Sequence, residues 1–391
     1  MIELATGPDQ RERGKESPGQ GPQGRGSNAR PRAFSGIQSS GRLHIGNYLG
    51  AMRPQVALQE THDAFYAVVD YHALTSVHDA SELRRLTREA ALDYLAVGLD
   101  PEKSTVFRQS DVPLHTDLCW VLATVTPLSW CVHLPTFKDK KKDQAGDVNL
   151  GLLSYPVLQA ADIIMYKAVA VPVGKDQVPH IEFAREVVRR FNSVYGETFP
   201  EPQAVLGAAP LVLGVDGTRK MSKSLKNHIE IFASREELHA RVGMMVTDTE
   251  KIRRGDPGHP GRCNVFSLHR YFRPESAGTA QGTAQGAARD AGAEQGAGAE
   301  GGPGELAADL AEISAGCAGG KLGCVECKGH LAGVIDAHLA PLRERRAELA
   351  ARPGRVDEIL AACAARATRV AEATMDEVRA KTGLGRITRG G

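Results

Sequence analysis

Two short segments, far apart in the chain, carry residue types that bind phosphate groups. The first, residues 35–47 (SGIQSSGRLHIGN), follows an apolar stretch, turns on two glycines and leads into a helical pattern. At such a turn, free backbone N–H groups and the positive end of the helix point at a bound anion. Strand–glycine–helix turns are common, so this segment alone indicates nucleotide binding only weakly.

The second segment, residues 220–224 (KMSKS), lies in an expected loop and contains Lys220 and Lys223. Lysines on a loop suit transfer at phosphorus, because negative charge grows on the phosphate oxygens as the bond breaks and must be neutralised. Taken alone, the segment is also compatible with a solvated basic loop. Both segments together favour a nucleotide triphosphate as the ligand.

Four cysteines could form a third site. Cys324 and Cys327 are separated by two residues, Cys317 and Cys324 by six, and Cys263 and Cys317 by 53. If the stretch between Cys263 and Cys317 loops out, four thiolates can converge on one metal centre. Such a set suits zinc or an iron–sulfur cluster, and the spacing does not choose between them.

Alternating elements must position the two phosphate motifs. Short apolar runs predict strands at 34–38, 65–70, 105–108 and 169–173, with a further strand near Leu211. Helical patterns follow Gly46, begin at Asp79 with Glu82 three residues on, fill much of 114–167, and run from Asp176 to about residue 195. This order predicts an α/β, Rossmann-type, doubly wound parallel sheet with a helical insertion.

The remainder of the chain predicts a mostly α-helical C-terminal domain. Ser234 and Glu237 form a capping box, and the last sixty or so positions are rich in Ala, Leu and Arg, punctuated by Pro341 and Pro353. Residues 276–304 are rich in Gly, Ala and Gln and read as a flexible linker. We therefore expect a disordered tail at 1–32, an α/β domain at 33–230, and a helical domain at 231–391 interrupted by that linker.

Composition sets few further limits. The 391 residues are 42% hydrophobic and carry a formal net charge of +1, so charge neither favours nor excludes a nucleic-acid partner. The most apolar segment, 150–173, is interrupted by Asp162 and Lys167, and the start of the chain lacks the apolar core of a secretory signal. We expect a cytoplasmic protein whose seven cysteines form no disulfide framework.

The two phosphate motifs, in this order, resemble the paired signatures of class I aminoacyl-tRNA synthetases. His44-Ile45-Gly46-Asn47 stands where that class has a His-Ile-Gly-His type sequence, and Asn in the last position is usual among its tryptophan and tyrosine enzymes. Residues 152–162 (LLSYPVLQAAD) and 171–182 (VPVGKDQVPHIE) are similar to segments of tryptophanyl-tRNA synthetases. The resemblance to that family covers roughly residues 33–275 and 305–386.

The resemblance implies that the tryptophan carboxylate attacks the α-phosphorus of Mg-ATP in line, after which the terminal ribose of tRNA(Trp) takes the tryptophanyl group. A carboxylate is already a nucleophile, so activation needs no general base. Positioning and charge stabilisation remain, and the implied catalytic residues are His44, Lys220 and Lys223. A homodimer, with 33–230 as the catalytic domain and 231–391 as the anticodon-binding domain, is also implied.

The expected tryptophan site is built around Asp162. Tyr155 and Gln159 lie seven and three residues before it, on the same face of a helix. Since an indole has one N–H donor and no acceptor, an acceptor-only carboxylate suits it, and such a site would reject phenylalanine by as much as about ten-thousand-fold. The alternative is an ordinary surface aspartate. By resemblance the site also includes Gln177 and Tyr155 for the ammonium group, and Phe34, His72, Val171 and Val173.

The expected ATP site joins both phosphate motifs to a tight turn. Gly174, Lys175 and Asp176 lead into a helix and are expected to hold the ribose and adenine. Lys140, within a run of charged residues, is a candidate for the pyrophosphate end, although such runs are usually solvated surfaces. The other expected ATP-binding residues are Gln38, Ser39, Ser40, Gly46, Asn47, Leu211, Lys220, Met221, Ser222, Lys223 and Ser224.

Some tryptophanyl-tRNA synthetases that this chain resembles carry a four-iron, four-sulfur cluster on a Cys…Cys-x6-Cys-x2-Cys arrangement. By resemblance, Cys263, Cys317, Cys324 and Cys327 would hold such a 4Fe-4S cluster, with zinc or no metal as alternatives. Gln159, where many relatives have Met, leaves the polarity of the pocket open. Leu225-Lys226-Asn227, where relatives often have Asp-Pro-Asn, leaves the resting conformation of the lysine loop open.

Two other functions stay in view. A tyrosyl-tRNA synthetase of the same class could use the same carboxylate, since a phenol also donates a hydrogen bond. A catalytically inactive RNA-binding paralogue would keep the fold, but His44, Lys220, Lys223, Asp162 and Gln177 are all retained. An iron–sulfur redox protein would not explain the two phosphate motifs.

Overall fold

The computed structural model describes residues 30–39, 41–134, 137, 149–207, 211–223, 225–273 and 310–385. The expected tail at 1–32, apart from its last three residues, and the whole expected linker at 276–304 lie outside the described residues, as do Ser40, Lys140 and Ser224. From Pro31 onward the chain forms one unit by its internal contacts.

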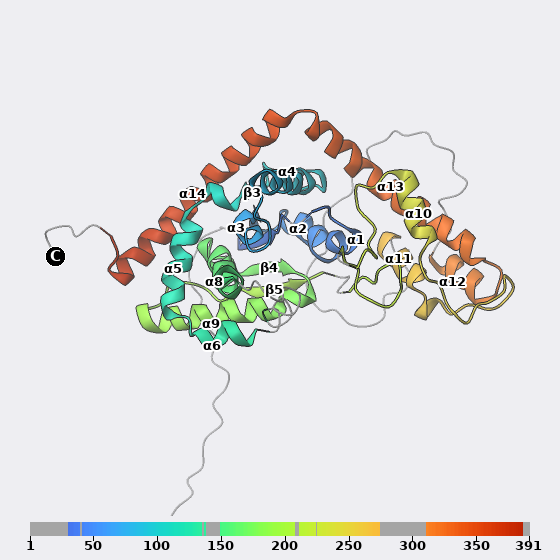
Figure 1. Cartoon of the computed structure of the whole chain (residues 1–391), viewed down its shortest axis with the longest axis horizontal. Helices are drawn as coiled ribbons and strands as arrows, with labels where there is room; N and C mark the ends of the chain where they lie inside the picture. Colours follow the sequence, from blue (N-terminus) through green and yellow to red (C-terminus); the bar gives the residue numbers. More distant parts are fainter. Residues whose placement is uncertain are drawn as a thin grey trace, which may run out of the picture. The chain divides into compact units, whose positions relative to one another are not determined.

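A five-stranded, entirely parallel sheet lies at the centre of this unit (Figure 1). Its order is β3-β2-β1-β4-β5. Since β1 has β2 on one side and β4 on the other, the winding direction reverses between β1 and β4, and ligands bind at the carboxyl ends of the strands at such a point. The bounds are β1 Arg32–Ile37, β2 Asp63–Val68, β3 Ser104–Arg108, β4 Ala170–Val173 and β5 Gln203–Leu206.

Helices cover both faces of the sheet, because alternate residues of the central strands point into two different cores. Ala64 and Tyr66 of β2 join a core built with α1, α2, α4, α10, α11 and α13. Phe65 and Ala67 of the same strand join a core built with α5, α8, α9 and α14. A strand that is buried on both faces in this way is typical of a doubly wound fold, and the predicted fold class is confirmed.

The helices that follow the first three strands carry the first phosphate motif and its support. After β1 come α1 (Ile45–Asn47), a π-helical turn (Tyr48–Met52) and α2 (Arg53–Leu58). After β2 come α3 (Asp70–Ala73) and α4 (Ala80–Ala96), and Asp79 caps α4 by accepting a hydrogen bond from the backbone N–H of Glu82, as the sequence predicts. A 3-10 turn, Gln109–Asp111, follows β3.

The predicted helical insertion separates β3 from β4. It consists of α5 (Leu114–Val125), α6 (Leu128–His133) and α8 (Leu150–Met165). After β4, a 3-10 turn (Lys175–Gln177) precedes α9 (Val178–Tyr195), so the helix expected from Asp176 begins two residues later. No described helix is both long enough and apolar enough to span a membrane.

One strand prediction was wrong. The last strand of the sheet is β5 at Gln203–Leu206, and the apolar run near Leu211 forms no strand of the sheet. Leu213 instead makes an isolated bridge with Lys220, which folds the segment back onto the lysine loop. An apolar run of this length does not reveal whether its partner is the sheet or a nearby loop.

The second half is helical, as predicted. It comprises α10 (Arg235–Gly243), a 3-10 turn (Pro260–Arg262), α11 (Asn264–Phe272), α12 (Leu310–Ala318), α13 (Cys324–Ala350) and α14 (Pro353–Thr382). Ser234 and Glu237 form the expected capping box of α10. Pro353 begins α14, whereas Pro341 lies inside α13 without ending it. In Figure 1, α13 lies beside α10 and α11, and α14 lies along the β3 edge of the sheet.

Candidate active site

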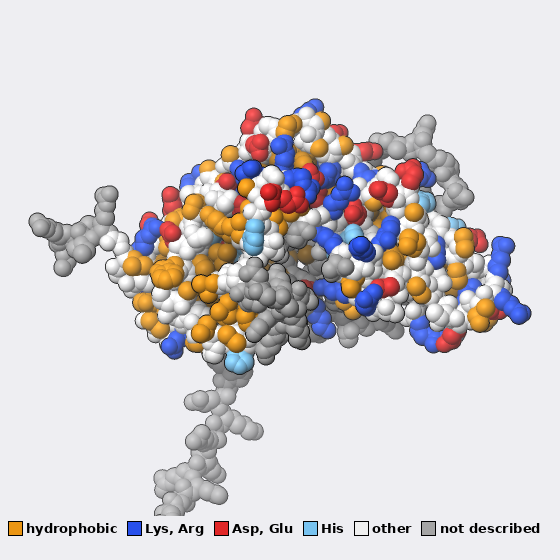
Figure 2. All heavy atoms as spheres, viewed as in Figure 1, with side chains coloured by type: hydrophobic (Ala, Val, Ile, Leu, Met, Phe, Trp, Pro, Cys, Tyr) orange, Lys and Arg blue, Asp and Glu red, His pale blue; other side chains and the backbone are white. Residues whose placement is uncertain are grey.

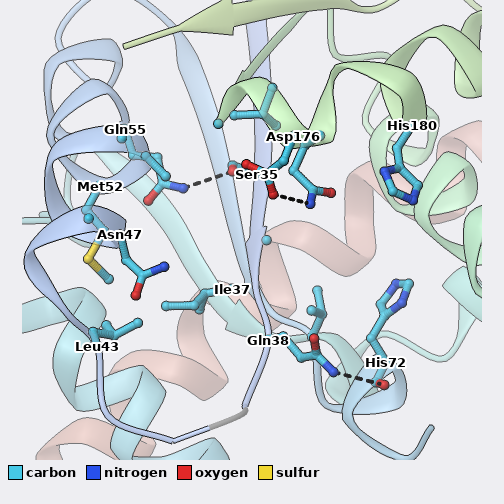
Figure 3. Close-up of a pocket in the computed structure, with 18 of the residues that line it drawn as sticks. Ser35, Ile37, Gln38, Leu43, Asn47, Met52, Gln55, His72, Asp176 and His180 are labelled. Atoms are coloured by element: carbon cyan, nitrogen blue, oxygen red, sulfur yellow. Dashed lines mark hydrogen bonds between the residues drawn. The ribbon is translucent and has the colours of Figure 1, made fainter. Parts of the chain in front are cut away.

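A cavity of about 620 Å³ opens at the carboxyl ends of β1 and β4, where the winding direction reverses (Figure 3). Both phosphate motifs and the acidic helix α8 contribute to its walls. The sequence-predicted residues that line it are Phe34, Gln38, His44, Gly46, Asn47, His72, Tyr155, Gln159, Asp162, Val171, Val173, Gly174, Asp176, Gln177, Leu211, Lys220, Met221, Ser222 and Lys223.

Two of the described sequence-predicted residues lie outside this lining. Ser39 is buried and its hydroxyl oxygen accepts a hydrogen bond from Thr87 of α4, at 3.3 Å, so it joins the first phosphate motif to α4. Lys175 is exposed on the 3-10 turn that precedes α9.

The first phosphate motif is held in shape by His44 and Asn47. Nδ1 of His44 accepts a hydrogen bond from the backbone N–H of Asn47 at 3.3 Å, and Oδ1 of Asn47 accepts one from the backbone N–H of His44 at 3.2 Å. This reciprocal pair caps the start of α1. Asn47 can therefore replace a histidine at this position, since its side-chain oxygen satisfies a backbone donor.

The environment of His44 is unfavourable to a positive charge. Burial, together with the charges of Lys223, His228 and Lys220, lowers the pKa of His44 to about 3. The imidazole is thus neutral at physiological pH, and because Nδ1 accepts a hydrogen bond, Nε2 carries the proton. His44 therefore offers a hydrogen-bond donor to the cavity, and the positive charge comes from the two lysines.

The lysine loop is anchored at both lysines. Lys220 Nζ donates to Oδ1 of Asp176 at 2.9 Å, and this links the loop to the turn before α9. Burial acts to raise the pKa of the Asp176 carboxyl, but hydrogen bonds from Lys220 and Gln177 outweigh it and lower that pKa. Lys223 Nζ donates to the backbone oxygen of Gly41 at 2.9 Å, which links the loop to the first motif.

The side chain of Asn227 fixes the backbone of the lysine loop by hydrogen bonds. Its Oδ1 accepts from the N–H of Ser222 at 2.8 Å, and its Nδ2 donates to the carboxylate of Asp216 at 2.8 Å and to the oxygen of Lys220 at 3.2 Å. Lys226, just before it, adopts a left-handed φ of 51°. The loop thus has a defined conformation with Leu225-Lys226-Asn227 in place of Asp-Pro-Asn.

Asp162 is a deeply enclosed acidic group of the cavity. It is 1% exposed, and its carboxylate binds His115 Nδ1 at 2.7 Å, Gln109 Nε2 at 2.6 Å and His72 Nε2 at 2.8 Å. Burial acts to raise the pKa of the Asp162 carboxyl, but the hydrogen bonds from His115 and His72 outweigh it and lower that pKa. The group is therefore an anion, and a surface role for it is excluded.

The carboxylate of Asp162 still has capacity for a ligand. Oδ1 accepts hydrogen bonds from both His115 and Gln109, whereas Oδ2 is bonded to His72. A carboxylate oxygen can accept two hydrogen bonds, so Oδ2 can accept one more donor from the cavity. A single N–H or O–H group that enters between Phe34, Val171 and Val173, which line the same cavity, would meet this acceptor.

Three residues that support the pocket were not predicted from the sequence. Gln109 and His115 orient Asp162, and His115 is itself bonded to the hydroxyl of Tyr166 at 2.8 Å. His180 binds the hydroxyl of Tyr155 at 2.8 Å and so orients that ring. Gln109 directly follows β3, so the rule that ligands lie beyond strand ends could have found it. The sequence held no comparable signal for His115.

The four cysteines expected at a metal centre lie near one another. The thiol of Cys327 interacts electrostatically with those of Cys263, Cys317 and Cys324, and burial raises the pKa of Cys327 to about 12. A Cβ atom on Gly258 would lie 2.5 Å from Sγ of Cys317, so only glycine permits this approach. As the described side chains stand, however, no three or more His, Cys, Asp or Glu residues form a group that could hold a metal ion.

Comparison with known proteins agrees with this geometry. A family model described as tRNA synthetases class I (W and Y) matches residues 26–340. The tryptophan–tRNA ligase of Thermotoga maritima is 39% identical over 353 residues, which cover 89% of this chain and 98% of that protein. The corresponding ligase of Aquifex aeolicus is 36% identical over 420 residues, with the same two coverages.

A solved structure is similar over nearly the whole chain. The tryptophanyl-tRNA synthetase of Campylobacter jejuni, crystallised with ADP and tryptophan, is 34% identical, and the two structures give a TM-score of 0.75. The similarity covers 90% of this chain and all of that one. The match therefore extends across both the sheet and the helical second half.

Proposed function

The chain belongs to the class I tRNA synthetase family of the tryptophan and tyrosine enzymes, and from this premise we propose that it is a tryptophan–tRNA ligase. It activates L-tryptophan with ATP to give tryptophanyl-adenylate and pyrophosphate, and it then transfers the tryptophanyl group to tRNA(Trp). The observation that carries the proposal is one cavity that joins both phosphate motifs to the buried Asp162 carboxylate.

In the activation step, an oxygen of the tryptophan carboxylate forms a bond to the α-phosphorus of Mg-ATP, and the bond from that phosphorus to pyrophosphate breaks. Lys220, Lys223 and the Nε2–H of His44 line the cavity where charge accumulates on the phosphate oxygens. In the second step, a ribose hydroxyl of the tRNA attacks the adenylate carbonyl, loses its proton, and releases AMP.

The choice of tryptophan follows from the surroundings of Asp162. In this proposal the indole N–H donates to Oδ2, and Tyr155 and Gln177, which line the same cavity, bind the ammonium group. Apolar walls from Phe34, Val171 and Val173 match the flat faces of the ring. A tyrosine phenol could reach the same carboxylate, so tyrosine is the competing amino acid that an experiment must include.

Tryptophan-dependent exchange of pyrophosphate into ATP tests this assignment directly. We expect exchange with tryptophan and at most traces with tyrosine or phenylalanine, followed by charging of tRNA(Trp). Exchange with tyrosine at a comparable or higher kcat/KM would overturn the choice of amino acid. No exchange with any amino acid would instead indicate a catalytically inactive, RNA-binding paralogue.

We further propose that residues 231–391 bind the anticodon region of tRNA, and that the chain acts as a homodimer in the cytoplasm. Hydrophobic side chains gather over the region of α5 and α6 (Figure 2). Trp120 is 73% exposed, Leu128 67% and Leu150 76%. Exposed apolar side chains of this size, on a face where hydrophobic side chains gather, are typical of an interface, and a second copy of the chain is the partner that the family assignment supports.

We also propose that the four neighbouring cysteines hold a metal centre. Four neighbouring thiols are a donor set that fits a 4Fe-4S cluster or, alternatively, zinc, and Cys263, Cys317, Cys324 and Cys327 would hold it. Such a group would act structurally, by joining α11, α12 and α13. Anaerobically purified protein should contain bound iron and should absorb broadly at about 400 nm, as an iron–sulfur cluster does. Protein with neither iron nor zinc would refute a metal centre.

A further inference from the structure

Arg346 joins α13, in the helical second half of the chain, to α4. Its Nε donates to Oδ1 of Asp93 at 2.7 Å, and it also bonds to the carboxylate of Glu89. The guanidinium lies 5.1 Å from the ring centroid of Phe232. Asp93 is 3% exposed, so this charge is enclosed within the fold. Glu89, Asp93 and Arg346 are called the α4–α13 ion cluster below.

The ammonium group of Lys223 interacts with this cluster. Lys223 Nζ donates to the backbone oxygen of Gly41, where φ is +99°, and its charge is attracted by Asp93 and by Glu230. Burial lowers the pKa of Lys223, while these two carboxylates oppose the effect. A lysine that must carry charge to a phosphate therefore depends on nearby anions to stay protonated in an enclosed place.

Helix α4 also contacts the first phosphate motif. The hydroxyl of Thr87 donates to that of Ser39 at 3.3 Å, two residues before Gly41. Lys223 is thus linked to α4 in two ways. Its hydrogen-bond acceptor, the backbone oxygen of Gly41, lies two residues from Ser39, which bonds to α4, and the carboxylate that attracts it, Asp93, belongs to α4. Any shift of α4 relative to the lysine loop changes both contacts together.

We propose that Asp93 is a positioning residue for Lys223: held by Arg346 of α13, its carboxylate keeps the ammonium charged and docked at Gly41, ready for the phosphates of ATP. This inference rests on the proposed function, because it assigns a role in that reaction. Asp93 touches no substrate. It acts through the lysine, and α13 acts through Asp93.

The contact with α13 makes the second half of the chain part of this arrangement. Arg346 is the cation that offsets the cost of burying Asp93, and removing one partner of a buried ion pair leaves the other uncompensated. A second contact on the same helix supports the coupling, since His338 Nε2 is hydrogen-bonded to the hydroxyl of Tyr48 at 2.7 Å, directly after the first phosphate motif. Displacement of α13 would reach the lysine loop through Arg346.

The arrangement predicts a specific pH dependence. Burial raises the pKa of Asp93 to about 6, Arg346 and Lys223 oppose the rise, and Glu89 adds to it. The other titratable or charged groups around the lysine are Glu230, which contacts Arg42 and His228, and His44, whose pKa the charge of Lys223 lowers. Asp93 is ionised above this pKa, so exchange activity should rise as pH rises through about 6 and be fully present above it.

Asp93→Asn tests the proposal, and Glu89→Gln is the matched control. Each variant removes one carboxylate from Arg346, but only Asp93 also interacts with the charge of Lys223. At pH 8 we expect Asp93→Asn to lower kcat for tryptophan-dependent exchange about five- to tenfold, with the KM for tryptophan unchanged and the acid limb near pH 6 lost. Glu89→Gln should keep its kcat at pH 8. Equal losses in both variants would overturn the proposal.

A double-mutant cycle tests whether Asp93 acts through Lys223. In a Lys223→Ala background, adding Asp93→Asn should cause no further loss, since the residue through which it acts is gone. Additive losses would show that Asp93 acts elsewhere. If the wild-type chain shows no exchange at all, the proposed function fails instead, so the two failures are distinguishable.

Arg346→Gln provides a second route if Asp93→Asn does not fold. Loss of the guanidinium should move the acid limb of exchange to higher pH, because Asp93 then ionises less readily. Arg346→Lys, which keeps the charge, should largely restore its position. An acid limb that stays at the wild-type pH in Arg346→Gln would refute the link between α13 and the lysine.

Discussion

The two lysines of the loop are bonded to different acceptors within the protein. Lys220 pairs with Asp176 at the mouth of the cavity, where both side chains are about half exposed (53% and 52%). Lys223 is held deeper, on the oxygen of Gly41. ATP must compete with these contacts when it binds. We therefore infer that the lysines leave protein acceptors for phosphate oxygens as the nucleotide enters.

Replacement of Lys223 by Ala should lower the rate of adenylate formation by on the order of a hundredfold or more, because a charge contact to the transition state is lost. The dissociation constant for tryptophan should stay near the wild-type value, since Lys223 does not face Asp162. Exchange kinetics and equilibrium binding measure the two effects. Lys226→Ala, three residues along the same loop, serves as control. Unchanged exchange in Lys223→Ala would show that the loop assignment is wrong.

At Asp162, replacement by Asn should weaken tryptophan binding by about a hundredfold or more, because the amide nitrogen cannot accept the indole N–H and faces the donors His72 and His115. The KM for ATP should change little. Thermal unfolding must accompany the measurement, since the position is 1% exposed. Asp117→Asn, at an exposed position on α5, is the control. Wild-type tryptophan affinity in Asp162→Asn would remove the carboxylate from the site.

How far the sequence predicts these residues depends on whether the motif itself contains the chemistry. His44, Lys220 and Lys223 are within their motifs, and all line the cavity. The helical spacing of Tyr155, Gln159 and Asp162 also suffices to bring them to one cavity. The partners of Asp162 come from elements 47 to 90 residues away in the chain, and no local pattern links such positions.

At the scale of elements, the lysine loop depends on Asn227 for its shape. Asn227→Ala removes three hydrogen bonds: two to the loop backbone, at Lys220 and Ser222, and one to the carboxylate of Asp216. We expect kcat for exchange to fall about tenfold, because a flexible loop places its lysines less accurately, while tryptophan affinity stays the same. Steady-state exchange and tryptophan binding measure this. Asn192→Ala, at an asparagine that also bonds to backbone but lies at the end of α9, should keep wild-type kcat.

The elements were predicted well where a short motif defines them and poorly where a short apolar run does not reveal its partner. The caps of α4 and α10 follow from Asp79 with Glu82 and from Ser234 with Glu237, each only three residues apart. The strand expected near Leu211 was wrong, since that run pairs locally with the lysine loop, and β5 was missed because its four residues alternate too little to indicate a strand. Pro341 did not end α13, because its neighbours pack on both sides of it.

At the scale of the whole molecule, the two halves share one catalytic arrangement. Helix α13 contacts the first phosphate motif through His338 and α4 through Arg346, while α14 lies along the β3 edge of the sheet (Figure 1). The predicted boundary at residue 230 thus separates segments of sequence that remain in contact in the folded chain. If the helical half binds tRNA, as we propose, that binding can influence the ATP site through these direct contacts.

The proposed dimer depends on the exposed apolar surface of α5, α6 and the start of α8. If a second copy covers α5, α6 and the start of α8, Trp120→Glu should place a charge in an apolar interface, where it is strongly unfavourable. We expect sedimentation to show a dimer for the wild type and a monomer for Trp120→Glu at micromolar concentration. Ile252→Glu is the control, because Ile252 is even more exposed, at 84%, but lies in the helical second half. It should remain dimeric. If Trp120→Glu remained dimeric, or if only Ile252→Glu became monomeric, the interface could not lie at α5. Both side chains are largely exposed, so the two variants differ mainly in their location.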